Sequence, residues 1–334
     1  MWPFIKPINL IRYLVVLRVN SSLVRLPRCL STELSLVLGT MIANRLPTRE
    51  ARPWRKALAP WDEHGGISLV GKKKPTTIPE ASWPIEAVLF VYPGKGIYGR
   101  GESILWELKL MGESADHGRF LEVILPALEE AGTVSDQQLQ RRNSLWGRFD
   151  IQAVYAARGP QWEPVVSDGR LDLNYRASPV QWAEGLTFEP RSERVFDRLT
   201  WITPFDFSDA DQPGRRRRRK TIPSHQAPTL QSMLDSLISR MSLLLPGKYN
   251  TADDLWAILS SEEQAELRAA MEQASHIPIH HNSLRSAPKS WPGRWIGTQT
   301  FASIPHPIIP YLELASILHI GRQTHLGCGT FAIS

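Results

Sequence analysis

The sequence predicts an α+β protein made of two ferredoxin-like domains in tandem, with an irregular, proline-rich insertion. Two observations lead to this prediction. The first half of the chain has the order strand, helix, strand, strand, helix, strand, and the second half repeats it. The length of 334 residues also suits two domains, since one domain takes about 150 residues. We expect a first domain over residues 1–160, a linker over 161–192 and a second domain over 193–334.

In the first half, β-branched residues predict a strand over 10–19. Apolar residues at helical spacing then predict a helix over 31–45, with Ser31 as its N-cap and Pro47 as its stop. The prolines between 47 and 84 indicate irregular chain with one short strand at 67–70. The remaining expected elements are strands at 86–92, 104–111 and 148–156 and a helix at 118–131.

The second half repeats the pattern, beginning with a strand at 194–207. A helix is expected near 229–245, because its apolar residues recur on one helical face. The elements that follow are a charged helix at 251–274, a strand at 293–303, a helix at 310–319 and a terminal strand at 330–333.

The charge of the chain is distributed unevenly along the sequence. The 39 Lys and Arg residues outnumber the 33 Asp and Glu residues, which gives a net charge of +6. One run of six basic residues accounts for this net charge, so the positive and negative charges of the other residues balance. The run consists of Arg215, Arg216, Arg217, Arg218, Arg219 and Lys220. The run predicts an electropositive site for a polyanion such as RNA. Its alternatives are a solvated loop and a contact with anionic lipid, and no adjoining amphipathic anchor supports the lipid contact.

Several features bear on where the protein works. A composition of 42% hydrophobic and 22% charged residues excludes wholesale disorder. The longest apolar stretch, 34–43, is far shorter than the roughly 20 residues that span a bilayer. No signal peptide is expected, and two cysteines, Cys29 and Cys328, are too few for a disulfide framework. We therefore expect a cytoplasmic protein without a membrane partner.

Three motifs resemble cofactor or metal sites but lack the required context. The glycines at 94, 96 and 99 match a dinucleotide-binding string, yet they precede a strand where that site needs a helix. The segment 209–214 begins like a calcium loop, but Lys220 takes the place of its bidentate glutamate. Glu272 and the histidines at 276, 280 and 281 are interrupted by Pro278. We expect no cofactor and no metal.

The glycine-rich segment near the C-terminus follows an apolar helix and precedes the last strand. It holds Gly321, Gly327 and Gly329, with Arg322 and His325 among them. Glycine lets the backbone approach a ligand closely, and the N–H groups of such a turn can bind a phosphate. The alternative is a tight connection between helix and strand, and the residues leave both open.

Three segments together resemble one family. Residues 314–333, LASILHIGRQTHLGCGTFAI, resemble the C-terminal signature of the CRISPR-associated RAMP-superfamily endoribonucleases that process precursor CRISPR RNA. Residues 101–112, GESILWELKLMG, resemble the family's central segment, and 201–207, WITPFDF, resemble the strand that opens its second half. The sequence departs from the family in its first helix, which contains no histidine.

The resemblance implies metal-independent cleavage of a repeat hairpin, in which a ribose 2′-OH attacks the adjacent phosphate and leaves a 2′,3′-cyclic phosphate. Such a reaction needs a base, an acid and a cation on the phosphate. The candidates for proton transfer are His64, His117 and His325, with Arg28 or Arg322 as the cation. The expected RNA-binding residues are the run 215–220 and the glycine-rich segment.

The resemblance leaves one principal alternative, a non-catalytic subunit that binds guide RNA within a CRISPR effector complex. Under either interpretation the expected partners are CRISPR repeat RNA and other effector subunits. An ordinary RRM is disfavoured, because no Lys/Arg-Gly-aromatic-Gly/Ala-Phe stretch is present.

Overall fold

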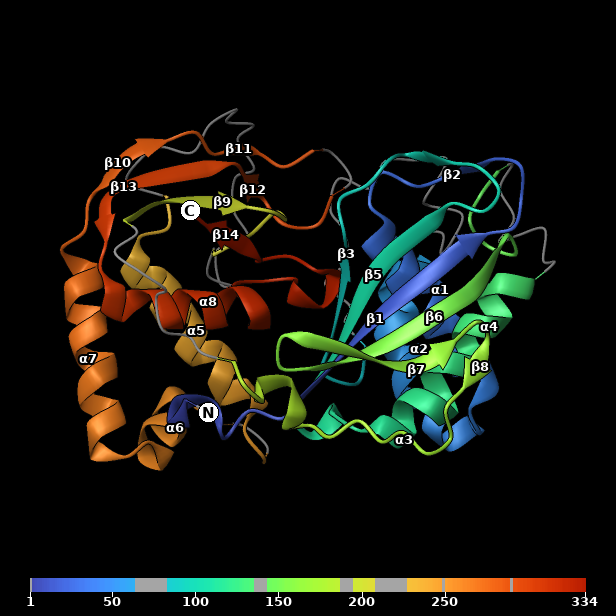
Figure 1. The fold of residues 1–334 in the computed structure, drawn as a ribbon, viewed down its shortest axis with the longest axis horizontal. Coiled ribbons are helices and arrows are strands. Elements are labelled where there is room, and N and C mark those ends of the chain that lie inside the picture. The colour runs from blue at the N-terminus through green and yellow to red at the C-terminus, as the bar shows by residue number, and fades with distance from the viewer. Residues whose placement is uncertain are drawn as a thin grey trace. The chain divides into compact units, whose positions relative to one another are not determined.

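The computed structural model describes residues 2–63, 83–134, 143–186, 195–207, 227–247, 250–288 and 291–334. The chain divides into two compact units (Figure 1). The N-terminal unit is Asn9–Gly185, and the C-terminal unit combines Met1–Ile8 with Leu186–Ser334. Within the described ranges, no helix is long and apolar enough to cross a membrane.

The N-terminal unit is built on a six-stranded antiparallel sheet of order β3-β5-β1-β6-β7-β8. Its strands are β1 (Leu10–Val19), β3 (Ala87–Val91), β5 (Ser103–Met111), β6 (Phe149–Arg158), β7 (Gln161–Ser167) and β8 (Arg170–Leu171). The central strand β1 pairs with β5 on one side and β6 on the other. This order, with the first strand between the third and fourth strands of the motif, is that of a ferredoxin-like fold. Strands β7 and β8, which extend the sheet, lie in the segment we expected to be a linker.

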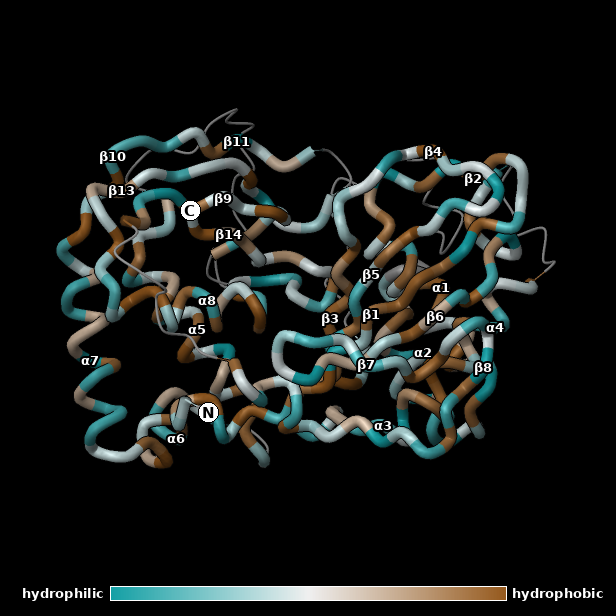
Figure 2. The backbone as a smooth tube through the Cα atoms, viewed as in Figure 1, coloured by the Kyte–Doolittle hydropathy of each residue, from teal (hydrophilic) through white to brown (hydrophobic). Residues whose placement is uncertain are grey.

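Helices cover one face of this sheet. They are α1 (Leu30–Arg45), α2 (Thr48–Glu63) and a helical segment made of α3 (His117–Arg119), a π-helical stretch (Phe120–Ile124) and α4 (Leu125–Thr133). The stretch ends just before Pro126, which has no N–H to donate to the preceding turn. Alternate residues of β1, namely Tyr13, Val15 and Leu17, are fully buried in this core. Figure 2 shows the hydrophobic positions concentrated along β1 and β5.

The first part of the proline-rich segment between 47 and 84 is a helix, where we expected irregular chain. Residues 48–63 form α2 although Pro53 and Pro60 lie inside it. The buried Trp54 packs against Trp83, with ring centroids 5.2 Å apart, and tertiary packing of this kind outweighs the local cost of proline. The strand expected at 67–70 lies outside the described residues.

The C-terminal unit repeats the motif on a four-stranded antiparallel sheet of order β10-β13-β9-β14. Its strands are β9 (Phe196–Trp201), β10 (Ile279–Asn282), β13 (Thr298–Ile304) and β14 (Phe331–Ile333). The helices are α5 (Leu230–Leu244), α6 (Ala252–Ile258), α7 (Ser261–Ser275) and α8 (Ile309–Leu318), and α5 and α8 lie on the same side of the sheet (Figure 1). The strand order again places the first strand between the third and fourth. The predicted tandem ferredoxin-like fold is therefore confirmed.

A buried ion pair stabilises the centre of the N-terminal sheet on the face away from its helices. Glu107 on β5 accepts a hydrogen bond from Arg12 on β1 at 2.5 Å and a second from the Tyr92 hydroxyl at 3.3 Å. The Glu107 side chain is only 2% exposed. Burial alone would raise the pKa of Glu107, but Lys109 and Arg12 together hold it below its ordinary value.

We expect Glu107→Gln to lower the free energy of unfolding of the N-terminal unit by about 3–5 kcal/mol, since it leaves Arg12 and Lys109 without their carboxylate. The ionised carboxylate stabilises the fold fully above its ordinary pKa of 4.5, and this contribution is lost as the pH falls through the folded-state pKa. The wild type should therefore lose more stability on acidification than the variant. Urea unfolding followed by tryptophan fluorescence at about pH 7 and pH 4 measures both effects.

The matched control is Glu102→Gln, which breaks an exposed ion pair with Lys95. Exposed pairs contribute about 0–1 kcal/mol. Equal losses in the two variants would contradict the assignment of Glu107 as a structural carboxylate.

Candidate nucleic-acid interface

Three segments far apart in the sequence meet at one end of the N-terminal sheet. Strand β2 (Val24–Arg25) pairs with β4 (Ile97–Tyr98). The Arg25 N–H donates to Asn143 O at 2.6 Å, and the Asn20 N–H donates to Arg148 O at 3.1 Å. These bonds join the chain after β1 to the chain before β5 and the chain before β6.

The joined segments carry six basic residues, which we call the basic end: Arg18, Arg25, Arg28, Lys95, Arg100 and Arg148. Arg148 is half-buried, and the other five are exposed. Two carboxylates lie on the same segments, and each has its own partner. Glu102 pairs with Lys95 and accepts a bond from the Gly99 N–H, and Asp150 accepts one from the Asn20 amide at 3.0 Å.

Carboxylates of the protein therefore neutralise little of the positive charge of the basic end. Among the described residues, no ion pair involves any of its five arginines. Exposed arginines without carboxylate partners suit a phosphate backbone, because each binds a phosphate oxygen and releases a counterion. The basic end is the strongest candidate nucleic-acid interface in the described N-terminal unit.

Arg28, one of the two residues predicted as the cation on the phosphate, is part of the basic end and precedes the first turn of α1. The N-cap of α1 is Cys29, whose sulfur lies 3.3 Å from the Ser31 hydroxyl and 3.2 Å from the Thr32 hydroxyl. A helix N-terminus carries partial positive charge, so Arg28 and the first turn of α1 together favour an anion.

His117 lies in the core of the N-terminal unit. Its Nδ1 is 2.9 Å from the Tyr13 hydroxyl, and the Tyr13 ring stacks on Phe120 at 3.8 Å. Burial is the main cause that lowers the pKa of His117, and Arg176 adds to the effect. A neutral, buried imidazole in these contacts favours a structural role.

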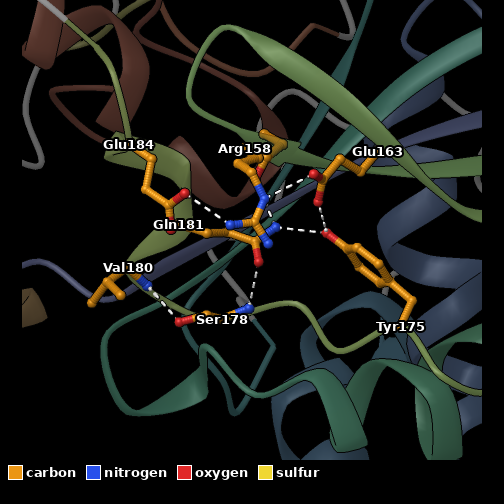
Figure 3. A network of polar contacts seen from close by, with 8 residues as sticks. Arg158, Glu163, Tyr175, Ser178, Val180, Gln181 and Glu184 are labelled. Atoms are coloured by element: carbon orange, nitrogen blue, oxygen red, sulfur yellow. Dashed lines mark hydrogen bonds and ion pairs between the residues drawn. The ribbon is translucent and has the colours of Figure 1, made fainter.

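A polar network connects the surroundings of His117 to the β6–β7 hairpin (Figure 3). Arg158 bridges Glu163 and Glu184 at 2.8 Å each, and the Tyr175 hydroxyl donates to Glu163 at 3.0 Å. The fully buried Gln181 donates to Ala157 O and to the Tyr175 hydroxyl. These contacts hold the segment after β8 against β6, and their groups are already paired with one another.

The glycine-rich segment near the C-terminus packs tightly on the chain after β9. The Gly321 N–H donates to the Ser236 hydroxyl, and the N–H groups of Arg322 and Gly329 donate to Asp206 O and Pro204 O. Gly329 has φ +87°, and a Cβ there would lie 1.9 Å from Ile320 O. Because these N–H groups are used within the fold, the geometry favours the tight connection over a phosphate-binding turn at these three residues.

The other predicted residues lie in different places. His325 is half-buried in a short helical turn, Thr324–Leu326, within the glycine-rich segment. His64 and the run Arg215–Lys220 lie outside the described residues. In the part of the chain that the structure describes, no group of three or more His, Cys, Asp or Glu side chains could hold a metal ion.

The sequence prediction missed most of the basic end. Arg18, Arg25, Arg100 and Arg148 are single cations scattered over 131 positions, and no local pattern marks them. Their positions at strand ends could have indicated that two of them lie close together. Arg18 lies near the end of one predicted strand, and Arg148 begins another.

We expect Gly329→Ala to destabilise the C-terminal unit by more than the roughly 1–2 kcal/mol that a left-handed backbone costs alanine, because the new Cβ also meets Ile320 O. Gly247→Ala is the control: its φ is +114°, but the new Cβ meets only a side-chain atom of Asn250 at 3.3 Å. Thermal unfolding of both variants measures the difference. Equal losses of stability in the two variants would show that the close approach of Ile320 O to Gly329 does not contribute to the cost of the substitution.

Comparison with known proteins gives one match to a family model, over part of the chain. Residues 199–331 match the family model described as CRISPR-associated endoribonuclease Cas6. None of the curated proteins compared matches the sequence.

The solved structures compared show the fold. A partial Cas6-RT-Cas1--Cas2 complex and a Cas6-RT-Cas1--Cas2 complex each match with a TM-score of 0.50 and 15% identity over 98% of this chain. This chain covers 46% and 29% of those two chains, so it spans less than half of their length. A Cas6 product complex matches with a TM-score of 0.48 and 16% identity, over 98% of this chain and 100% of that one. The fold of this chain is therefore similar to that of the two complexes, and residues 199–331, which span most of the C-terminal unit, are similar to the Cas6 family of CRISPR-associated endoribonucleases.

Proposed function

We propose that this chain is an endoribonuclease that binds precursor CRISPR RNA and cuts it within the repeat. The observation that carries the proposal is the match of residues 199–331 to a family described as CRISPR-associated endoribonucleases. The basic end supports it independently, since it offers exposed arginines to a phosphate backbone. The partners that follow are repeat RNA and other CRISPR proteins, as in the Cas6-RT-Cas1--Cas2 complexes to which the fold is similar.

The proposed chemistry needs no redox group. The 2′-OH loses its proton to a base and attacks the adjacent phosphorus, the bond to the 5′-oxygen breaks, and an acid protonates that leaving oxygen. The products are a 2′,3′-cyclic phosphate and a 5′-OH. Arg28, next to the N-terminus of α1, is our proposed cation for the phosphate, where charge accumulates during the attack.

His64 and His325 are the proposed residues for proton transfer, in that order. His117 ranks behind them, because it is buried and bonded to Tyr13. Alanine at the true base should lower the cleavage rate by roughly 10²–10⁴-fold with little change in affinity. If no histidine variant is slower, arginines and the bound geometry carry the reaction.

We expect the purified protein to cut a repeat-hairpin RNA in EDTA. Cleavage should stop when one 2′-deoxy sugar replaces the nucleotide upstream of the cut, because that removes the nucleophile and keeps every phosphate. Mapping of product ends by gel and mass spectrometry checks both results. Loss of cleavage in EDTA with recovery on adding Mg²⁺ would overturn the mechanism, and tight binding without any cleavage would identify a non-catalytic subunit.

We expect Arg25→Gln and Arg28→Gln each to weaken RNA binding and to lower the slope of log K against log salt. One lost phosphate contact lowers that slope by about 0.9 on a duplex and about 0.7 on a single strand. Arg268→Gln on α7 is the matched control, since it removes one charge from a helix that carries Glu262, Glu263, Glu266 and Glu272. Fluorescence anisotropy at several salt concentrations measures the slopes. If the slope changes as much in Arg268→Gln as in the Arg25 and Arg28 variants, neither of these two arginines makes a specific phosphate contact.

A further inference from the structure

The C-terminal unit is discontinuous in the sequence. It consists of Met1–Ile8 and Leu186–Ser334, and the residues between these two parts, 9–185, form the N-terminal unit. The chain therefore begins in one unit, forms the whole of the other and then returns to the first. What the first few residues contact decides whether this topology has a consequence for stability.

Residues Trp2–Ile8, which we call the strap, are anchored in the C-terminal unit by aromatic rings. The rings of Trp2 and Phe4 each lie 5.0 Å from the ring of Tyr311, centroid to centroid, and both contacts are edge-to-face. Phe4 and Tyr311 are buried, and ring pairs of this geometry stabilise a core beyond the area that they bury. Tyr311 lies in the first turn of α8, so the strap is held against a core helix of this unit.

The strap has little conformational freedom of its own. Pro3 and Pro7 each fix one backbone angle. The Lys6 N–H donates to Pro3 O and the Ile8 N–H donates to Ile5 O, each at 3.0 Å. Because proline also restricts the unfolded chain, ordering such a segment costs less entropy than ordering a flexible one.

The strap continues into β1 of the N-terminal unit without a linker. Ile8 is only 1% exposed, and Leu10, two residues later, is the fully buried first residue of β1. Asn9 lies between them, and its carbonyl accepts a bond from the Gly112 N–H at 2.9 Å. The Leu10 N–H donates to Pro179 O at 2.8 Å. The crossing from one unit to the other is thus hydrogen-bonded on both sides.

This topology makes the docking of the strap depend on the state of the N-terminal unit. While residues 9–185 are folded, the two ends of that unit are fixed and docking the strap closes no flexible loop. If residues 9–185 unfold, docking the strap closes all of them into one long loop, which lowers the docking equilibrium constant by up to about 10³-fold. The closed loop also restricts the unfolded N-terminal unit, so the coupling acts in both directions.

We propose that the strap is a link through which the two units stabilise each other, with Phe4 and Tyr311 as its anchor. When the N-terminal unit unfolds, the strap loses its advantage, and α8, which leads into the glycine-rich segment, loses an aromatic partner. The inference concerns the stability of the full chain and does not depend on the proposed function.

The test uses the full chain and asks whether a loss of stability in one unit reaches the other. Glu107→Gln removes the buried ion pair of the N-terminal unit. Hydrogen–deuterium exchange with mass spectrometry then follows the amides of β9 and β13 in the C-terminal unit, at a urea concentration that unfolds the N-terminal unit of this variant. We expect Glu107→Gln to lower the protection of those amides by about 10²–10³-fold. In a chain that also carries Phe4→Ala, Glu107→Gln should leave their protection unchanged.

Phe205→Ala is the matched control, because it removes a buried ring that stacks on Trp201 at 3.9 Å in the C-terminal unit and leaves the strap intact. Trp2→Ala, at a half-buried anchor, takes the place of Phe4→Ala if that variant does not fold. If the effect of Glu107→Gln on β9 and β13 persists in the Phe4 variant, or is lost equally in the Phe205 variant, the strap is not the link. If Glu107→Gln alone has no effect on these strands, the two units are independent and the proposal is wrong.

Discussion

The pairing register of the two central strands is the constraint on which the rest of the structure depends. Strand β1 lies between β5 and β6, and β9 lies between β13 and β14. Because side chains alternate between the faces, a slip of one residue in β9 would expose Leu199 and Trp201 and bury Arg198. The apolar residues of the packed faces therefore determine which polar residues the other faces present.

The two sheets use their second faces in different ways. In the N-terminal sheet this face holds the buried pair of Arg12 and Glu107, and the Trp162 ring lies 5.3 Å from the Arg12 guanidinium. Charges there are paired inside the protein, where they support the fold. In the C-terminal sheet the equivalent face carries the exposed Arg198 and Thr200 and the half-buried Thr300, and no ion pair within the described chain involves Arg198. The repeated fold is therefore a common scaffold whose second face holds a buried ion pair in one unit and exposed polar side chains in the other.

Elements with strong periodicity were predictable from the sequence, and those that depend on distant contacts were not. The strand at 10–19 and the helix at 31–45 agree with β1 and α1, because both have a clear apolar pattern. The predicted N-cap was wrong, since Cys29 takes that position and Ser31 lies inside the helix. Strand β10 was missed, since its sequence of isoleucine, two histidines and asparagine has little strand preference and depends on pairing with β13. The glycines at 321 and 329 were recognised as special, but only the structure shows that Asp206 O and Ile320 O lie where a Cβ would be.

The distribution of charge in three dimensions changes what the balanced composition means. Outside the run at 215–220 the sequence sums to zero, which led us to expect one basic site. In the structure, this net charge of zero is the sum of regions with positive charge and regions with negative charge. Helices α6 and α7 hold six carboxylates and one arginine, and the basic end holds six cations and two carboxylates. The acidic residues gathered on α6 and α7 repel a polyanion from that helical segment, and the cations of the basic end attract one. A net charge counted along the chain hides this separation, and for a protein that binds a polyanion the separation matters more than the total.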